Sequence, residues 1–410
     1  MEEIKYQELL QTLNFFVDNF IPAEIINEQI NIQYTDLDNN NYFHYLSNYS
    51  FKDYCIFKGF SSENEIITKE KYKSLLNQYL DRINSFIEIL ITSNCDLTSE
   101  NVFEQIPLDL CLIKQNYYMA KEYIKYQSLF SSFFNKNGLN MLFLNNCLDE
   151  ECIEFILNLF KTLKQKDYEQ DVIKNYLTRK IEPSSYITPL IALFRNYNKY
   201  IYTKFNKLLK INAIEFLQKG EKGEYLIPND EETKKNIKAK TILELNNFCI
   251  NSFYNLYEIF IESGAEFNYI ELYSEKKDIS SFMYLMAYPK MPDLLSFIIK
   301  NKINVNYQDY LGRTPLIHLI NNKENIINIS NETYYEAFDE LNKYYLSDLS
   351  KRDINGISAF LLCLINNYYI DAKDIYNSHI DKLLQDFNLD ILLFLIIKIV
   401  NNYHMNLNRT

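Results

Sequence analysis

The chain has 410 residues and a formal net charge of −12, from 42 basic and 54 acidic residues. Hydrophobic residues make up 47% of it and charged residues 23%, the balance of a folded protein rather than a disordered one. The acidic excess argues against nucleic acid as a partner, and the length suits a fold that grows by repetition better than one compact core. The clearest basic run, residues 234–240, directly follows acidic residues and is interpreted as the solvated part of an insertion.

Both ends of the chain are predicted to be helical caps. Residues 1–35 carry apolar residues at helical spacing but open with acidic residues, so no secretory signal is expected. Residues 388–410 contain the most apolar run of the chain. Lys398 interrupts this run, which is much shorter than the roughly 18 residues that suggest a membrane span. We therefore expect a cytoplasmic protein without a membrane span.

Residues 309–316 contain the clearest local pattern, D-x-x-G-x-T-P-L. Gly312 can adopt the positive φ that a tight turn needs, at no steric cost. Thr314 is a natural N-cap, and Pro315 suits the first helical position, where its missing donor is not needed. The pattern therefore predicts a tight turn that leads into a capped helix.

The same pattern recurs along the chain at a period of roughly 33 residues or more. Residues 353–360 repeat it in full. In an earlier copy Asn39 occupies the glycine position, which Asn tolerates better than other residues with a β-carbon. The copies place predicted helix starts at Tyr42, Ser74, Pro107, Met141, Pro189, Ile242, Ser281, Pro315 and Ala359. Several intervals exceed the period and none falls far below it, which predicts insertions around residues 163–185, 218–238 and 322–350.

This pattern resembles the ankyrin repeat, and residues 264–268 and 303–306 are similar to the G-A-D-V-N segment that ends the family's second helix. The resemblance is clearest over about 250–365, and the period extends it to residues 36–390. The implied repeats start near residues 36, 71, 104, 135, 186, 239, 278, 309 and 353. The resemblance implies an all-α, ankyrin-like solenoid of stacked helix-turn-helix repeats with insertions, in which short turns replace strands.

The resemblance also implies a function, because ankyrin repeats bind partner proteins through turn tips and inner helices along a concave face. We therefore expect a protein–protein interaction module or scaffold, with a partner protein that the sequence does not identify. In the family, residues that flank the turn glycine point into the binding groove. Carried over residue by residue, the partner-binding candidates are Tyr307, Gln308, Tyr310, Arg313, Arg352, Ile354, Asn355 and Ile357. Tyrosine and arginine often anchor interfaces, but solvated turn residues in a tyrosine-rich chain would give the same pattern.

The sequence lacks the short motifs of catalysis and metal binding, such as H-E-x-x-H, paired C-x-x-C and G-x-S-x-G. His44 and His318 lie near the position where the family's histidine bridges neighbouring turns. Cys95, Cys111 and Cys363 fall where the repeat expects small core residues, which predicts buried, reduced thiols. We therefore expect no enzymatic activity, no cofactor and no metal. The alternative is an effector or enzyme whose chemistry lies in an insertion or a terminus and which uses the repeats for targeting.

Overall fold

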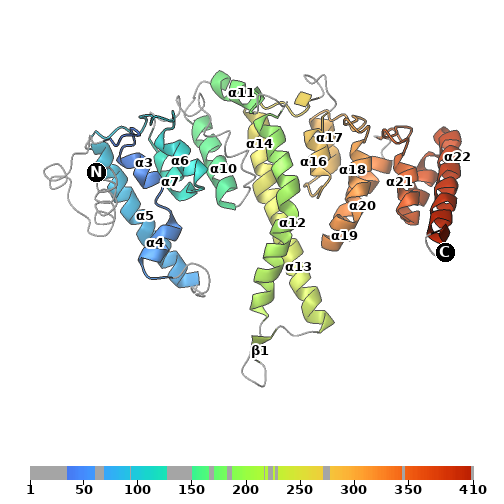
Figure 1. Cartoon of the computed structure of the whole chain (residues 1–410), viewed down its shortest axis with the longest axis horizontal. Helices are drawn as coiled ribbons and strands as arrows, with labels where there is room; N and C mark the ends of the chain where they lie inside the picture. The colour runs from blue at the N-terminus through green and yellow to red at the C-terminus, as the bar shows by residue number, and fades with distance from the viewer. Residues whose placement is uncertain are drawn as a thin grey trace. The chain divides into compact units, whose positions relative to one another are not determined.

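The structure is a computed structural model, in which the chain separates into two compact units, residues 1–176 and 177–410 (Figure 1). The described residues are 35–60, 69–92, 94–126, 150–165, 170–181, 187–216, 218–219, 225–226, 230–270, 278–343 and 347–407. They are mostly helical, and their strands are limited to one antiparallel pair of two-residue strands. The prediction of an all-α fold is therefore confirmed.

The first unit is built from short helices that pack against one long helix. Its helices are α3 (Tyr42–Ser47), α4 (Phe51–Phe57), α5 (Lys69–Thr92), α6 (Pro107–Ile113), α7 (Tyr117–Tyr123) and α10 (Glu150–Gln165). Helix α3 packs on α6, α6 on α7 and α7 on α10, while α5 contacts α3, α4 and α7. Aromatic side chains fill the interior. The Phe43 and Tyr123 rings meet edge to face at 5.7 Å between centroids, and the buried Tyr54 ring lies 5.7 Å from that of Tyr79.

The second unit contains a row of helices in successive contact. Helix α11 (Gln170–Thr178) spans the boundary between the units. The unit's other elements are α12 (Pro189–Glu215), β1 (Gln218–Lys219), β2 (Tyr225–Leu226), α13 (Glu231–Phe248), the π-helix η2 (Cys249–Tyr254), α14 (Asn255–Glu262), α16 (Ser281–Leu285), α17 (Leu294–Lys300), α18 (Pro315–Asn321), α19 (Lys323–Ile329), α20 (Asn331–Lys343), α21 (Ala359–Ile365) and α22 (Tyr369–Leu407). Helix α12 packs on α16, α16 on α18, α18 on α21 and α21 on α22.

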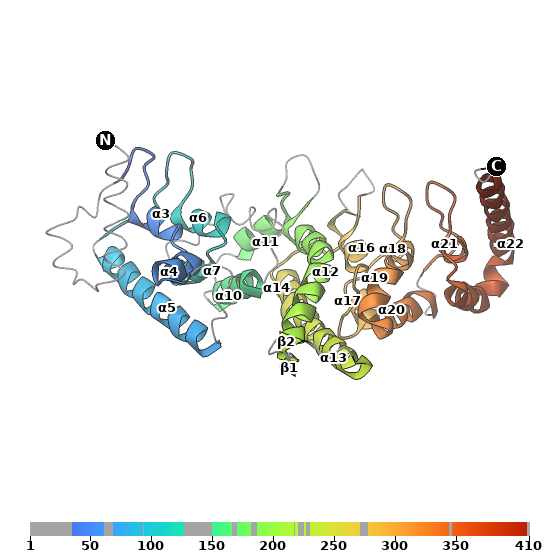
Figure 2. The ribbon, with the colours of Figure 1, turned by 60° about the horizontal axis from the view of Figure 1, so that its bottom comes forward.

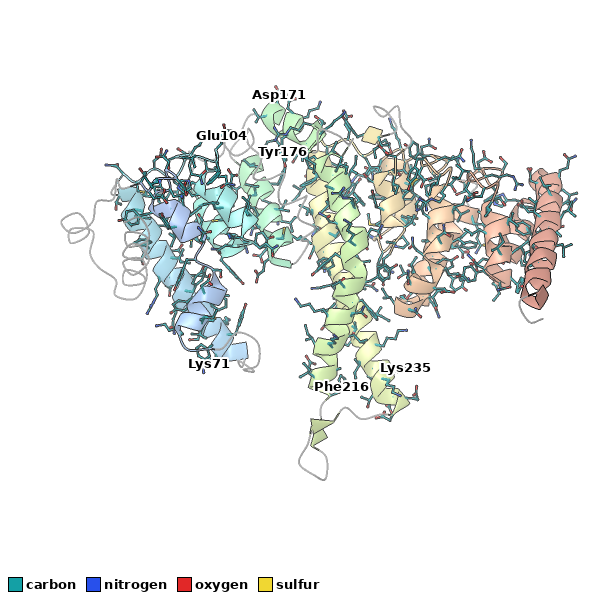
Figure 3. All side chains as sticks on the ribbon, in the orientation of Figure 1. Lys71, Glu104, Asp171, Tyr176, Phe216 and Lys235 are labelled. Atoms are coloured by element: carbon teal, nitrogen blue, oxygen red, sulfur yellow. The ribbon has the colours of Figure 1, made fainter. Side chains whose placement is uncertain are left out.

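Helices α12 and α13 form an arm that extends away from this row, with the β1–β2 pair at its far end (Figures 1 and 2). Figure 3 shows Phe216 and Lys235 near that end. The arm is held together by polar as well as apolar contacts. Buried Asn212 donates from Nδ2 to Thr241 Oγ1 at 3.1 Å and to Glu244 Oε2 at 2.8 Å. The predicted insertion at 218–238 therefore coincides, over its described residues, with the outer part of this arm.

Six of the nine predicted helix starts are the first residues of helices: Tyr42, Pro107, Pro189, Ser281, Pro315 and Ala359. The N-cap chemistry explains why most of these helices begin where they do. Thr314 and Ser358 each accept a hydrogen bond from the backbone three residues on, and Thr188 and Ser280 do the same. The predicted N-cap role of Thr314 is confirmed.

Two predicted helix starts are wrong, and a third lies outside the described residues. Ser74 lies inside α5 and Ile242 lies inside α13, and residues 71 and 239, where these repeats should begin, also lie within the two helices. Neither helix contains a glycine or proline, and nothing local therefore interrupts the helix at these positions. The start at Met141 falls on undescribed residues, as do residues 1–34 of the predicted N-terminal cap.

The remaining boundaries differ in detail from the prediction. The insertion around 322–350 contains two helices, α19 and α20, which pack against each other and against neighbouring helices of the row. The described residues of the predicted C-terminal cap, 388–407, are part of α22, which already begins at Tyr369. Helix α22 contacts α21, and within the predicted cap the buried Asp390 accepts a hydrogen bond from Ser358, the N-cap residue of α21.

Two ionisable residues of the first unit are buried: His44, whose ring nitrogens both have hydrogen-bond partners, and Asp109, one of whose carboxylate oxygens has none. The ring of His44 bridges two turns, with Nδ1 at 2.8 Å from Asn41 Oδ1 and Nε2 at 3.0 Å from the Gln105 carbonyl oxygen, which confirms its predicted bridging role. Burial lowers the pKa of His44.

Asp109 is also buried and accepts a hydrogen bond from the Ile106 backbone at 3.1 Å, but its Oδ1 has no partner. Burial raises the pKa of Asp109 to about 6.

Asp109→Asn should therefore stabilise the protein above pH 6. The folded state binds the Asp109 proton more tightly than the unfolded state, so its ionisation removes stability as the pH rises from about 4 to about 6. The neutral amide avoids this loss and should raise the free energy of unfolding by about 1–3 kcal/mol at pH 7.5. Urea denaturation of the wild type and the variant at pH 7.5 and at pH 4 measures the difference in their free energy of unfolding at each pH. An equal gain at the two pH values would contradict the assignment to ionisation.

Candidate functional site

Four tight turns of the described chain share one backbone geometry. They are residues 36–40, 101–105, 309–313 and 353–357. In each, the first residue donates its N–H to the carbonyl of the fifth at 3.0–3.1 Å, and the fourth donates to the carbonyl of the first at 2.8–3.0 Å. The fourth residue has a positive φ in every case: 63° at Asn39, 57° at Glu104, 73° at Gly312 and 76° at Gly356. The expected conformation of Gly312 is therefore confirmed.

The side chain of the first residue closes each turn. Asp309 Oδ1 accepts from the backbone N–H groups of Leu311 and Arg313 at 3.0 and 2.8 Å. Asp353 Oδ1 likewise accepts from the backbone N–H groups of the third and fifth residues of its turn, and Asn101 Oδ1 accepts from the same two positions of its turn in the first unit. Short polar side chains that bond to the following backbone are a known means of fixing such turns.

Neighbouring turns are joined in the same register in both units. The N–H of Val102 donates to the carbonyl of Asp38 at 2.8 Å, and the N–H of Ile354 donates to the carbonyl of Leu311 at 2.9 Å. In both pairs the donor is the second residue of the later turn and the acceptor is the third residue of the earlier one. Successive turns therefore lie side by side, along the edge of each unit where its helices begin (Figure 2).

The register places apolar side chains at the tips of all four turns. In the first unit the exposed fractions are 71% for Leu37, 57% for Val102 and 65% for Phe103. In the second unit they are 61% for Tyr310 and 65% for Ile354. The second residue of each of the four turns is thus a large apolar residue whose side chain is exposed to solvent. Each unit presents a short ladder of such side chains along its row of turns.

The eight residues predicted as partner-binding divide into two groups. Tyr310, Ile354 and Asn355 are exposed at the tips of adjacent turns, as the prediction requires. The other five are partly buried, and they are Tyr307, Gln308, Arg313, Arg352 and Ile357. Gln308 is engaged within the protein, because its Nε2 donates to the carbonyl oxygens of Gly312 at 2.7 Å and Arg352 at 2.9 Å.

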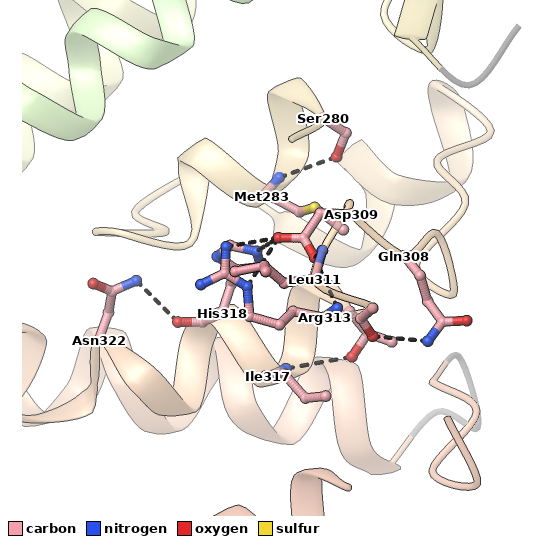
Figure 4. Close-up of polar contacts among 11 residues, drawn as sticks. Ser280, Met283, Gln308, Asp309, Leu311, Arg313, Ile317, His318 and Asn322 are labelled. Atoms are coloured by element: carbon pink, nitrogen blue, oxygen red, sulfur yellow. Dashed lines mark hydrogen bonds and ion pairs between the residues drawn. The ribbon is translucent and has the colours of Figure 1, made fainter. Parts of the chain in front are cut away.

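Arg313, another of the partner-binding candidates, is held by a buried carboxylate, and 24% of its side chain is exposed. Arg313 Nη2 lies 2.7 Å and Nε 2.9 Å from Oδ2 of Asp309, whose side chain is fully buried (Figure 4). His318 Nε2 lies 3.0 Å from the same oxygen, so this histidine supports its own turn and does not bridge to the next. Burial alone would raise the pKa of Asp309, but hydrogen bonds from His318 and Arg313 outweigh it and hold the pKa at about 2.

Arg352 is held in a similar way. Its Nη1 donates to the Gly356 carbonyl at 3.0 Å and makes a short contact with Asp390 of α22, which is buried and also accepts from the Ser358 hydroxyl. Burial raises the pKa of Asp390 despite these hydrogen bonds. A buried carboxylate without a partner would be strongly unfavourable. Each arginine provides that partner and thereby fastens its turn within the protein.

Three tip residues of the first unit were missed at the level of sequence: Leu37, Val102 and Phe103. The signal for Leu37 was present, because Asn39 marks the glycine position and the tip lies two residues before it. No such signal marks Val102 and Phe103, since the positive-φ residue of their turn is Glu104, whose side chain does not indicate that conformation. Figure 3 shows Glu104 at the edge of its unit.

The described residues hold no group of three or more His, Cys, Asp or Glu side chains that could bind a metal ion. Over the same residues, no helix is both long and apolar enough to cross a membrane. The predicted burial of Cys95, Cys111 and Cys363 is confirmed, and all three are free thiols. No family model matches the sequence, and no curated protein is significantly similar to it.

Proposed function

We propose that the chain is a protein-binding module, built as a divergent ankyrin-like array, that holds a partner protein against the tips of its stacked turns. The single observation that carries this proposal is the exposed apolar residue at the second position of all four described turns. A large apolar side chain in water gains free energy when a partner covers it. Nothing in turn geometry requires such a residue there, because the position points into solvent.

The ankyrin-like part of the proposal is supported by the geometry that the turns repeat. Turns of one conformation, each followed by a helix and joined to the next by the same backbone hydrogen bond, are what stacked repeats require. The long helices α5, α12 and α13 depart from a uniform repeat. We regard them as elaborations of the array.

Two features favour a protein partner over nucleic acid. The chain has a net charge of −12, and the two arginines closest to the exposed tips, Arg313 and Arg352, are paired with buried carboxylates. The charges of these two arginines are thereby used within the protein and are not presented to phosphate. The ladders instead present tyrosine, phenylalanine and aliphatic side chains, whose apolar surface gains free energy when a partner protein buries it.

The double variant Tyr310→Ser, Ile354→Ser should weaken partner binding at least about 10-fold without unfolding the protein. Both side chains are exposed and make few contacts in the free protein, so their loss should leave its stability nearly unchanged. Affinity purification from native cell extract with the wild type and the variant identifies proteins that the tips retain. Titration of such a protein then measures the affinity difference.

Ile299→Ser is the matched control, because Ile299 is 64% exposed on α17 and belongs to none of the turns. It should bind the partner as the wild type does. If the control loses the partner while the tip variant keeps it, the binding surface lies on the helices and the proposal fails.

A further inference from the structure

The turns of the first unit differ in charge from those of the second. The corresponding segments, each a turn with the residues that lead into it, are 35–40 and 96–105 in the first unit and 308–313 and 348–357 in the second. The charges of the second unit are balanced, with three acidic and three basic residues: Asp309, Asp348, Asp353, Arg313, Lys351 and Arg352. The segments of the first unit contain five acidic residues and no basic one: Asp36, Asp38, Asp96, Glu100 and Glu104.

Two of the five carboxylates of the first unit are not used within the protein. Asp36, by contrast, closes its own turn, because its Oδ1 accepts from the N–H of Asn40 at 2.7 Å. Asp38 and Glu104 are exposed, and over the described residues neither carboxylate has a hydrogen bond or an ion pair. Their negative charges therefore remain available to a cation from outside the chain.

Each of these two carboxylates directly follows an exposed apolar residue. Leu37, which is 71% exposed, precedes Asp38, and Phe103, which is 65% exposed, precedes Glu104. The N–H of Val102 donates to the carbonyl of Asp38 at 2.8 Å, so the two turns that carry these pairs are adjacent (Figure 2). Apolar and negative side chains therefore alternate over one short surface, which we call the acidic ladder: Leu37, Asp38, Val102, Phe103 and Glu104.

We propose that the acidic ladder binds a basic segment of a partner protein, in which lysine or arginine residues alternate with apolar ones. This proposal rests on the proposed function of the turn tips and adds the chemistry of the partner. Apolar side chains of the segment cover Leu37 and Phe103, which removes apolar surface from water. Its cations lie against Asp38 and Glu104, whose charges steer the segment to the ladder and select it over uncharged ones.

The charge of the first unit's turns disfavours three other occupants. Nucleic acid and anionic membranes carry negative charges, which these turns repel. A second copy of this chain carries a net charge of −12, and its mean field opposes its approach to an acidic surface. A different protein with a basic segment meets neither obstacle.

Fluorescence anisotropy with the full chain tests the proposal, with a labelled peptide of repeated Lys-Leu-Lys-Phe-Gly-Ser units as the probe. Two matched peptides carry glutamate in place of every lysine, or serine in place of every leucine and phenylalanine. The basic apolar peptide should bind at least about 10-fold more tightly than either of the others at low ionic strength. Its affinity should fall as salt is added, because salt screens exposed charges.

The double variant Asp38→Lys, Glu104→Lys should weaken binding of the basic apolar peptide at least about 10-fold at low ionic strength and remove most of its salt dependence. Asp81→Lys, Glu88→Lys is the matched control, because both residues are exposed on α5, outside the turns. The two double variants change the net charge of the chain equally. The control should therefore bind within about 2-fold of the wild type.

Phe103→Ser distinguishes a failure of this inference from a failure of the proposed function. If Phe103→Ser weakens binding while Asp38→Lys, Glu104→Lys does not, the tips bind through apolar contact alone, and only the partner chemistry is wrong. If the basic apolar peptide binds and Phe103→Ser changes nothing, the peptide lies elsewhere, and binding at the tips of the first unit is contradicted as well. Equal weakening by the control, or a wild type that does not bind the basic apolar peptide, overturns the inference.

Discussion

Asp371→Ala should lower the free energy of unfolding by about 3–5 kcal/mol. Asp371 lies in the first turn of α22 and is fully buried. Its two carboxylate oxygens each lie 2.7 Å from Nζ of Lys323, the first residue of α19, and Tyr334 of α20 donates its hydroxyl to Oδ2 at 2.6 Å. Removal of the carboxylate would leave a buried ammonium group without its counter-charge.

The surroundings of Lys323 make that loss hard to relieve. The rings of Tyr334, Tyr335 and Tyr368 lie 4.9, 5.3 and 4.5 Å from its Nζ, so aromatic faces surround the charge and only 8% of the side chain is exposed. The group ties α19 and α20 to α22, and we expect these three helices to loosen together in the variant. Hydrogen exchange of their backbone amides would detect this loosening.

The exposed pair of Lys343 and Asp339 provides the control. Its atoms lie 2.6 Å apart, but more than two-fifths of each side chain is in water. Asp339→Ala should therefore change the stability by less than about 1 kcal/mol. Urea denaturation at pH 7 measures both variants. A loss below about 1 kcal/mol for Asp371→Ala would show that Lys323 reaches solvent when its partner is removed.

Gly312→Val should destabilise the protein more than Gly356→Val, although the two glycines have nearly the same backbone conformation. Both have a positive φ, 73° and 76°, which a β-branched residue adopts only with strain of about 1–3 kcal/mol. A β-carbon at Gly312 would also lie 3.0 Å from the Cα of Asp353 and 3.1 Å from the carbonyl oxygen of Arg352. At Gly356 no atom lies within 4 Å of that position.

The extra contact at Gly312 comes from the backbone of the next turn, which cannot move aside as a side chain could. We expect a further loss of about 1–3 kcal/mol there, because the turns must separate and the hydrogen bond from Ile354 to Leu311 must lengthen. Thermal or urea denaturation of the two variants gives the difference directly. Equal destabilisation would mean that turn 353–357 does not approach turn 309–313 as closely as the structure has it.

Local chemistry explains why much of the helix framework of the second unit was predictable. Gly312, Thr314 and Pro315 each restrict the backbone at their own position, so the turn and the helix that follows depend little on distant residues. The same reasoning failed at Ser74 and Ile242, where the sequence matches the spacing but contains no residue that ends a helix. Spacing without such a residue does not predict a turn.

The candidate site was predictable only where its residues depend on the turn itself. Tyr310 and Ile354 follow from their place beside a turn glycine, and their exposure agrees with the prediction. The ion pairs of Arg313 and Arg352 could not be predicted in this way, because they depend on the burial of Asp309 and Asp390, which tertiary packing decides. Lys323 and Asp371 lie 48 residues apart in the sequence, and no local sequence pattern indicates that they pair. The resemblance to ankyrin repeats stays a prediction.

Site-specific photo-crosslinking in native cell extract tests the central claim most directly. A photoreactive phenylalanine analogue replaces Tyr310 in one variant, Ile354 in a second and Ile299 in a third, all of which are exposed. If the turn tips bind a partner protein, the variants at 310 and 354 should form the same covalent adduct, and the variant at 299 should not. Adducts at 299 alone, or no adduct at either tip, would contradict a partner-binding surface on the turns.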